Sequence, residues 1–158
     1  MKENEKILMV RPISNISLNR KFKEYVCLAQ GIGITPFRSI LLQARESPFP
    51  YKTILIHVSK GQHTFRKLTE SAANTAYFPT NATDFQKIVS QQKKDNYFLI
   101  SGSPNFTKGV QKNLLKQGVD RSQIKRDSFF VINFLVSDTH IVACCLNPAL
   151  RSKKSKSV

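Results

Sequence analysis

The sequence predicts an α/β fold with a doubly wound, five-stranded parallel sheet, and three observations lead to it. First, short apolar runs alternate with segments whose apolar residues recur at helical spacing. Second, strand–helix alternation of this kind requires parallel pairing with right-handed crossovers. Third, a chain of 158 residues is long enough for one domain with a large core, because it buries roughly two-thirds of the surface of its unfolded chain.

Five strands are expected from the apolar runs, of which the third is the weakest. The first run lies between polar residues and glycines, as expected for a strand buried on both faces. The predicted strands cover residues 25–29, 53–58, 75–78, 96–100 and 124–130.

Four helices are expected, one after each of the first four strands. Gly118 is expected to end the fourth helix in the left-handed conformation that glycine adopts easily. The apolar residues at helical spacing are Phe37, Ile40, Leu41 and Ala44; Phe65, Leu68 and Ala72; Phe85, Ile88 and Val89; and Phe106, Val110 and Leu114.

Two terminal segments fall outside this pattern, which covers residues 23–130. Residues 1–22 precede the first strand, and residues 131–158 follow the fifth as an atypical C-terminal extension. The extension ends in a basic run from Arg151 to Lys156, which we expect to be a solvated tail.

The formal net charge is +15, from 25 Lys and Arg against 10 Asp and Glu. A field of this sign favours anionic partners, which include nucleotides, acidic proteins, nucleic acid and anionic membrane surfaces. The charge alone does not choose among them.

Other features of the composition narrow the class of protein. No apolar run reaches 18 residues, so no membrane span is expected, and the N-terminal region lacks the apolar stretch of a secretory signal. Cys27, Cys144 and Cys145 fit neither a disulfide framework nor a paired metal site, and the histidines are scattered, so no metal site is predicted. The expected location is the cytoplasm.

The segment from Gly31 to Pro36 follows a predicted strand and opens a helix, which is the context in which a glycine motif indicates phosphate binding. Gly31 and Gly33 allow a sharp turn and a close approach of the backbone to a ligand. Thr35 is expected to cap the helix, and Pro36 suits its first turn. Free amides and the positive end of the helix dipole would then face a pyrophosphate. The alternative is a tight strand–helix turn without a ligand, since Pro36 replaces the third glycine of the usual dinucleotide motif.

A second loop of this type follows the fourth predicted strand. Gly102 is followed by Ser103, a hydroxyl cap, and by Pro104 at a helix start. In the common doubly wound orders, strands one and four are neighbours where the winding reverses, and ligands bind in the crevice there. The two loops are therefore expected to converge on one crevice.

The end of the second predicted strand bears on which nucleotide binds. Dehydrogenases that prefer NAD often have Asp or Glu there to bind the ribose hydroxyls. This sequence has Ser59 and Lys60, and the next carboxylate is Glu70. Ser59 and Lys60, helped by Arg66, would accept a 2′-phosphate, which favours NADPH; the alternative is that Lys60 is an ordinary exposed lysine.

With these motifs, the sequence resembles the NAD(P)-binding domain of the ferredoxin–NADP reductase family of flavin oxidoreductases. The matching segments are residues 31–38, 98–104, 114–119 and 124–129, in the family's order and at its usual separations. The resemblance covers about residues 10–130.

The resemblance implies that NAD(P)H binds to this domain and passes hydride to FAD, which a separate, preceding barrel mainly holds. No residue of this chain is assigned a catalytic role. The residues implied to bind the cofactor are Gly31, Ile32, Gly33, Ile34, Thr35 and Pro36 at the pyrophosphate, Ser59 and Lys60 at the adenosine ribose, and Gly102, Ser103 and Pro104 on the nicotinamide side.

The sequence also departs from the family. The flavin barrel is largely missing, and residues 1–22 are interpreted as a remnant of its end, in which Arg11 and Ser14 replace glycines of the relatives. Residues 131–158 continue past the usual terminus. Because hydride transfer needs donor and acceptor in contact, we expect the chain alone to be inactive. It is expected to be either a nucleotide-binding fragment that needs a flavin domain or an electron-acceptor protein as partner, or a degenerate remnant.

The alternative function is a basic, non-catalytic binding module for nucleic acid or an acidic protein, which the net charge of +15 supports. The sequence has no RNA-binding aromatic signature and no helix-turn-helix pattern, so no specific nucleic-acid partner is expected.

Overall fold

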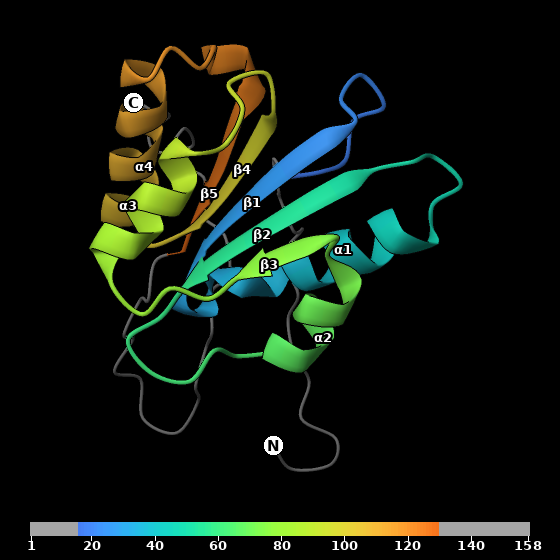
Figure 1. Cartoon of the computed structure of the whole chain (residues 1–158), viewed down its shortest axis with the longest axis horizontal. Helices are drawn as coiled ribbons and strands as arrows, with labels where there is room; N and C mark the ends of the chain where they lie inside the picture. The colour runs from blue at the N-terminus through green and yellow to red at the C-terminus, as the bar shows by residue number, and fades with distance from the viewer. Residues whose placement is uncertain (1–15, 130–158) are drawn as a thin grey trace, which may run out of the picture.

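Five parallel strands form one sheet in the computed structural model, which describes residues 16–129 (Figure 1). Their order across the sheet is β3-β2-β1-β4-β5, and every neighbouring pair is parallel. The predicted fold class is therefore confirmed. The strands are β1 (Glu24–Gln30), β2 (Lys52–Val58), β3 (Thr75–Tyr77), β4 (Tyr97–Gly102) and β5 (Ile124–Ser128).

Helices cover both faces of this sheet. α1 and α2 pack on one face and α3 and α4 on the other, so the sheet is doubly wound (Figure 1). Short 3-10 turns, η1 and η2, precede α1 and β5. The bounds of the helices and turns are η1 (Gly31–Ile34), α1 (Thr35–Glu46), α2 (Arg66–Ala72), α3 (Ala82–Ser90), α4 (Pro104–Lys116) and η2 (Arg121–Gln123).

Alternation along the central strand creates a separate core on each face. Tyr25 and Cys27 of β1 pack with α1 and α2, whereas Val26 and Leu28 pack with α3 and α4. Because both faces of β1 are covered, residues 25–29 are all buried, and the sequence shows them as a continuous apolar run.

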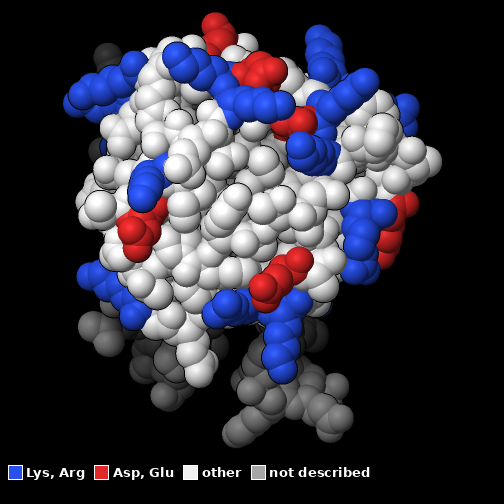
Figure 2. Space-filling view, viewed as in Figure 1, with Lys and Arg blue, Asp and Glu red and all other residues white. Residues whose placement is uncertain are grey.

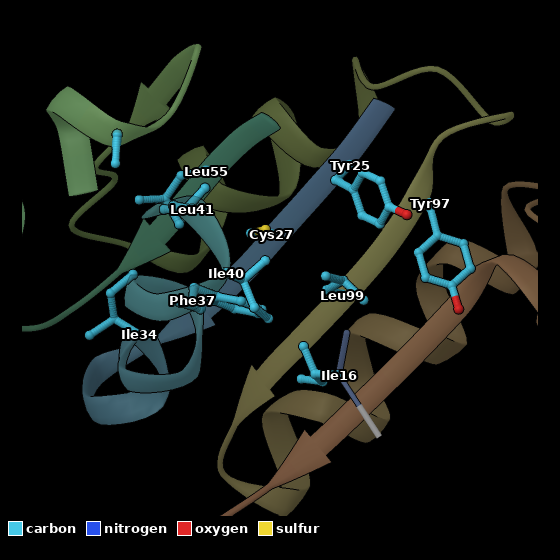
Figure 3. Close-up of a cluster of buried hydrophobic side chains, with 12 residues drawn as sticks. Ile16, Tyr25, Cys27, Ile34, Phe37, Ile40, Leu41, Leu55, Tyr97 and Leu99 are labelled. Carbon is cyan, nitrogen blue, oxygen red and sulfur yellow. The ribbon is translucent and has the colours of Figure 1, made fainter. Parts of the chain in front are cut away.

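The segment before β1 joins the core on the α1 face, although it forms no strand or helix. Ile16 is 6% exposed, and the ring of Phe22 stacks on that of Tyr97 with 4.3 Å between the centroids. Tyr25 lies beside Tyr97 in the same cluster, 5.5 Å between centroids (Figure 3). The Tyr25 hydroxyl donates to the backbone carbonyl of Asn19, and it also accepts from the backbone N–H of Asn19 at 2.6 Å. The rest of the expected barrel remnant and the C-terminal extension lie outside the described residues.

Helix α2 begins one residue later than its apolar spacing predicts. Phe65 precedes the helix with a left-handed backbone (φ 58°), and its carbonyl accepts from the N–H of Thr69 at 2.9 Å. The Arg38 guanidinium lies 5.3 Å from the centre of the Phe65 ring. Phe65 is therefore a half-exposed cap residue and not part of the buried helical face.

Helix α4 ends as the sequence predicts. Gly118 has a φ of 86°, its N–H donates to the Leu115 carbonyl, and the N–H of Val119 donates to the Leu114 carbonyl, both at 3.1 Å. This pair of bonds is a Schellman motif, which satisfies carbonyls that the helix end leaves without partners.

Within residues 16–129, none of the helices has the length and apolar character needed to cross a bilayer. The same part of the chain brings together no group of three His, Cys, Asp or Glu side chains that could hold a metal ion.

Candidate functional site

β1 and β4 are neighbours, and the chain leaves them toward opposite faces of the sheet. After β1 it enters η1 and α1 on one face, and after β4 it enters α4 on the other (Figure 1). At such a switch point the loops diverge and leave a crevice at the carboxyl ends of the strands. The two glycine loops therefore come together at the carboxyl ends of β1 and β4, as predicted.

The loops are in direct backbone contact at Gly33. A Cβ added there would lie 2.3 Å from the carbonyl oxygen of Ser101 and 2.8 Å from the nitrogen of Gly102. A Cβ on Gly102 would in turn lie 2.9 Å from Cβ of Gln30 and from Cδ1 of Phe106. Both glycines are thus required by the crossing of the loops, independently of any ligand.

The second loop belongs partly to the sheet. Ser101 and Gly102 were expected to follow the strand, but Ser101 pairs with Ala29 of β1 and Gly102 pairs with Ser128 of β5. The sheet therefore fixes the backbone up to the point at which α4 begins. The Ser101 hydroxyl is fully buried there and has no hydrogen-bond partner in the described part of the chain.

Ser103 caps α4 and connects the two loops. Its hydroxyl accepts from the N–H of Phe106 at 3.3 Å and donates to Oε1 of Gln30 at 2.7 Å. Pro104 occupies the first helical position. The cap and the proline confirm the predicted start of this helix, whereas Gln30 was not predicted, because its partner is 73 positions away in the sequence.

The first loop differs from its prediction at Thr35. Helical structure starts at Gly31 and continues through η1 into α1, so Thr35 is already helical. Its hydroxyl donates to the carbonyl of Ile32 at 2.7 Å, and the residue at the cap position, Ile34, makes no side-chain cap bond. The prediction that Thr35 caps the helix is wrong because the backbone before it, at Ile34, has helical angles (φ −67°, ψ −22°). Pro36 lies in the first turn, as expected.

The side chains of this loop divide between core and solvent. Ile34 is fully buried and packs with α1, so it offers a ligand only its backbone. Ile32 is 64% exposed, which is unusual for a large apolar side chain. Gly31 has a φ of 53°, and a Cβ there would meet no atom within 4 Å. The start of the loop, at Gly31 and Ile32, is thus accessible, whereas its end, at Ile34, is buried in the core.

His57 contacts the first loop from the end of β2. Its ring is fully buried, and Nε2 donates to the carbonyl of Gly31 at 2.9 Å. Burial lowers the pKa of His57 from 6.5 to about 4, so the ring is neutral at neutral pH. His57 is one of the scattered histidines for which no metal site was predicted, and it is not among the predicted cofactor-binding residues.

A groove of about 1140 Å³ opens beside the crevice, between α3 and α4. Ser59 and Lys60 line it, together with Gln30 and with Asn105 and Phe106 at the start of α4. The other predicted site residues (Gly31, Ile32, Gly33, Ile34, Thr35, Pro36, Gly102, Ser103 and Pro104) are not among its lining residues. The structure therefore separates the expected site into a loop crossing and an adjoining groove.

The described lining of the groove is positively charged. Four lysines line it, Lys60, Lys87, Lys112 and Lys116, and none of its described lining residues is a carboxylate. Its lining also includes the ring of Phe106. An aromatic, anionic ligand is the class that such a surface suits.

The face of the molecule drawn in Figure 2 carries both positive and negative side chains. Figure 2 shows Lys and Arg side chains around the periphery of this face with acidic side chains between them, rather than one continuous basic patch.

Solved structures of two flavohemoglobin-type proteins have this fold, each with a TM-score of 0.58. One is flavohemoglobin from Malassezia yamatoensis with bound FAD and heme, which is 17% identical; the match covers 69% of this chain and 32% of that one. The other is the flavohem-like FAD/NAD-binding domain of nitric oxide dioxygenase from Vibrio cholerae O1 biovar El Tor, which is 18% identical, with 75% and 55% covered.

A third similar structure is the ferredoxin reductase in carbazole 1,9a-dioxygenase. It has a TM-score of 0.52 and 17% identity, and the match covers 68% of this chain and 38% of that one. The chain thus spans between about a third and about a half of these structures, 32% to 55%. No family model and no curated protein matches the sequence. The resemblance to the ferredoxin–NADP reductase family is confirmed at the level of the fold.

Proposed function

We propose that this chain is the nicotinamide-dinucleotide-binding domain of a flavin-dependent oxidoreductase. The observation that carries the proposal is the position of the two glycine loops, which meet at the switch point between β1 and β4. Ligands of open α/β sheets bind at this position. The similar structures named above include FAD- and NAD-binding domains, which supports the same class of ligand.

The positions of the predicted site residues suggest how the dinucleotide would lie across the two loops. The exposed start of the first loop, Gly31 and Ile32, would bind the pyrophosphate through backbone amides. Ser103 and Pro104 would line the nicotinamide side. Ser59 and Lys60 would hold the adenosine ribose at the mouth of the α3–α4 groove.

The groove favours the phosphorylated dinucleotide over the unphosphorylated one. A carboxylate at the end of β2 would bind the ribose hydroxyls of NAD and repel a 2′-phosphate. Ser59 and Lys60 occupy this place, and the groove contains lysines without carboxylates among its described lining. The proposed preference is therefore for NADPH.

Hydride transfer from NADPH would need a flavin, which another domain would mainly hold. NADPH supplies a hydride when it is bound, and the residues of this chain bind and orient it. The described residues form the nucleotide half of such a site, so we expect no reaction until a flavin domain presents its acceptor. Which protein then receives the electrons depends on that domain or on a partner.

Thermal unfolding with and without ligand tests the proposal. A ligand that binds only the folded chain, present at about 100 times its Kd, adds roughly 2.7 kcal/mol to the free energy of unfolding, so NADPH should raise Tm by several degrees. Lys60→Ala should weaken NADPH about tenfold while changing NADH little. The matched control is Lys67→Ala, on the exposed surface of α2.

Three outcomes decide against parts of the proposal. If NADPH leaves Tm unchanged and generic DNA binds in a salt-sensitive way, the basic binding module is the better description. Equal losses for NADPH and NADH in Lys60→Ala would contradict the assigned 2′-phosphate contact. Turnover of NADPH with ferricyanide by the chain alone, without added FAD, would contradict the need for a flavin domain.

A further inference from the structure

We propose that His57 is a positioning residue, which orients the backbone of the Gly31 turn so that the amide of Ile32 faces the pyrophosphate. This inference rests on the proposed function for the identity of the ligand. The contact itself, between Nε2 of His57 and the carbonyl oxygen of Gly31, stands independently of it.

The geometry of the contact defines the state of the ring. The Gly31 carbonyl can only accept, so Nε2 of His57 carries the proton across their 2.9 Å separation. In the neutral ring, Nδ1 is then without a proton, and it has no hydrogen-bond partner among the described residues. The bond to Gly31 is thus the one polar contact that the described structure gives this ring, and it selects the tautomer.

Neighbouring rings hold the imidazole in place. His57 is fully buried, and the ring of His63 lies across it at 4.9 Å with an interplanar angle of 81°. The ring of Phe78 lies 6.3 Å away at 68°. A donor fixed in this way directs its N–H at one point, the carbonyl of Gly31.

The planarity of the peptide bond transmits this direction to the ligand side. The carbonyl of Gly31 and the N–H of Ile32 belong to one trans peptide unit and point in opposite directions. Because His57 holds the carbonyl toward the protein interior, the N–H of Ile32 is directed away from it, at a residue that is 64% exposed.

The turn needs such an anchor because its own conformation is permissive. Gly31 has a φ of 53° and no atom within 4 Å of its Cβ position, so local packing does not restrict it. Glycine populates several conformations at little cost. Without the bond from His57, the 3-10 turn η1 alone would hold the peptide between Gly31 and Ile32, and this peptide would rotate more easily toward presenting its oxygen to an anion.

The test compares three variants of the full chain. His57→Phe fills the space but cannot donate, whereas His57→Gln retains a donor N–H. His63→Phe is the matched control, because His63 lies against His57 but neither of its ring nitrogens has a hydrogen-bond partner among the described residues. Amide hydrogen exchange over residues 31–35 measures the turn without a ligand, and equilibrium binding of NADPH and of 2′-AMP measures the effect of the turn on binding. The second ligand lacks a pyrophosphate.

The proposal expects a specific pattern. In His57→Phe, exchange over residues 31–35 should increase about tenfold and NADPH should bind about tenfold more weakly, the size of one lost hydrogen bond. Binding of 2′-AMP to His57→Phe should stay within about threefold of the wild type. His57→Gln should restore the exchange rate of the loop and the affinity for NADPH to within about threefold of the wild type. His63→Phe should leave the exchange over these residues unchanged.

Other results would overturn it. Unchanged loop exchange in His57→Phe, or an equal loss of NADPH and 2′-AMP binding, would show that His57 only supports the end of β2. Exchange that rises equally across the whole sheet would show a general loss of stability. If the wild-type chain binds no NADPH, the proposed function fails, while loop exchange in the same variants still decides whether His57 anchors the turn.

Discussion

Gly33 illustrates how one residue joins the two halves of the crevice. Its missing side chain lets η1 lie against the backbone of Ser101 and Gly102, so the loops touch without a side chain between them. Gly31 has a different reason to be glycine, namely its left-handed backbone. The sequence motif predicts both glycines but cannot distinguish these two reasons.

Gly33→Ala should destabilise the chain and weaken the dinucleotide site together. The new Cβ would lie 2.3 Å from the Ser101 oxygen, so η1 and the end of β4 would have to move apart. Overpacking of this kind costs about 1–3 kcal/mol, and more where backbone must move, which urea unfolding measures. Gly109→Ala is the control: a Cβ there meets no atom within 4 Å, and alanine inside α4 should stabilise by about 1 kcal/mol. Equal effects of the two substitutions would contradict the crossing of the loops.

Residues with local sequence signals could be predicted, and residues with distant partners could not. Ser103 and Pro104 follow local rules for helix starts, and the structure has them in these roles. Gln30 and His57 contact atoms 73 and 26 positions away, so no motif or spacing identifies them. Thr35 matches the composition of a cap, but the 3-10 turn before it removes the non-helical position that a cap requires.

At the scale of elements, α1 and α4 begin in different ways although both sequences place a hydroxyl residue before proline. α4 has a side-chain cap, and α1 continues from a 3-10 turn without one. The difference arises because η1 must turn tightly to reach Ser101, whereas β4 runs straight to its last residue. The strand and helix periods were predicted well since both faces of the sheet are covered. The start and the end of α4 were also predicted, but the end of β4 was not, since it depends on pairing with β1 and β5.

Ser103→Ala should lower the free energy of unfolding by about 1 kcal/mol, because it removes the cap of α4. It also removes the donor to Gln30, so the two loops lose their side-chain connection. Ser103→Thr retains the hydroxyl and should behave as the wild type. Chemical denaturation of the three proteins measures the difference, and a Thr variant as unstable as the Ala variant would show that the cap is not responsible.

For the whole molecule, burial of two titratable groups limits the pH range of stability. The pKa of His57 is lowered to about 4, whereas the unfolded residue titrates near 6.5, so the unfolded chain binds more protons between these values. The free energy of unfolding should therefore fall as pH decreases from about 6.5 to about 4, by roughly 3 kcal/mol from this group. Burial raises the pKa of Cys27 from 9.0 to about 12, so stability should also fall above pH 9.

Urea unfolding across this pH range measures both effects. His57→Gln should reduce the acid-side slope, although His63, whose pKa burial also lowers, retains part of it. Cys27→Ala should reduce the alkaline-side slope while destabilising the core at all pH values. Slopes identical to the wild type in both variants would show that other groups govern the pH dependence.

The contact between Gln30 and Ser103 also has a consequence for the time order of folding. These residues are 73 positions apart, and β1 reaches β4 only after a long stretch of chain has closed on itself. Helical signal and partial collapse can arise earlier in refolding, but the crevice cannot exist before that closure. A ligand that requires both loops would therefore bind only after this closure, and loss of the pairing between β1 and β4 would release it.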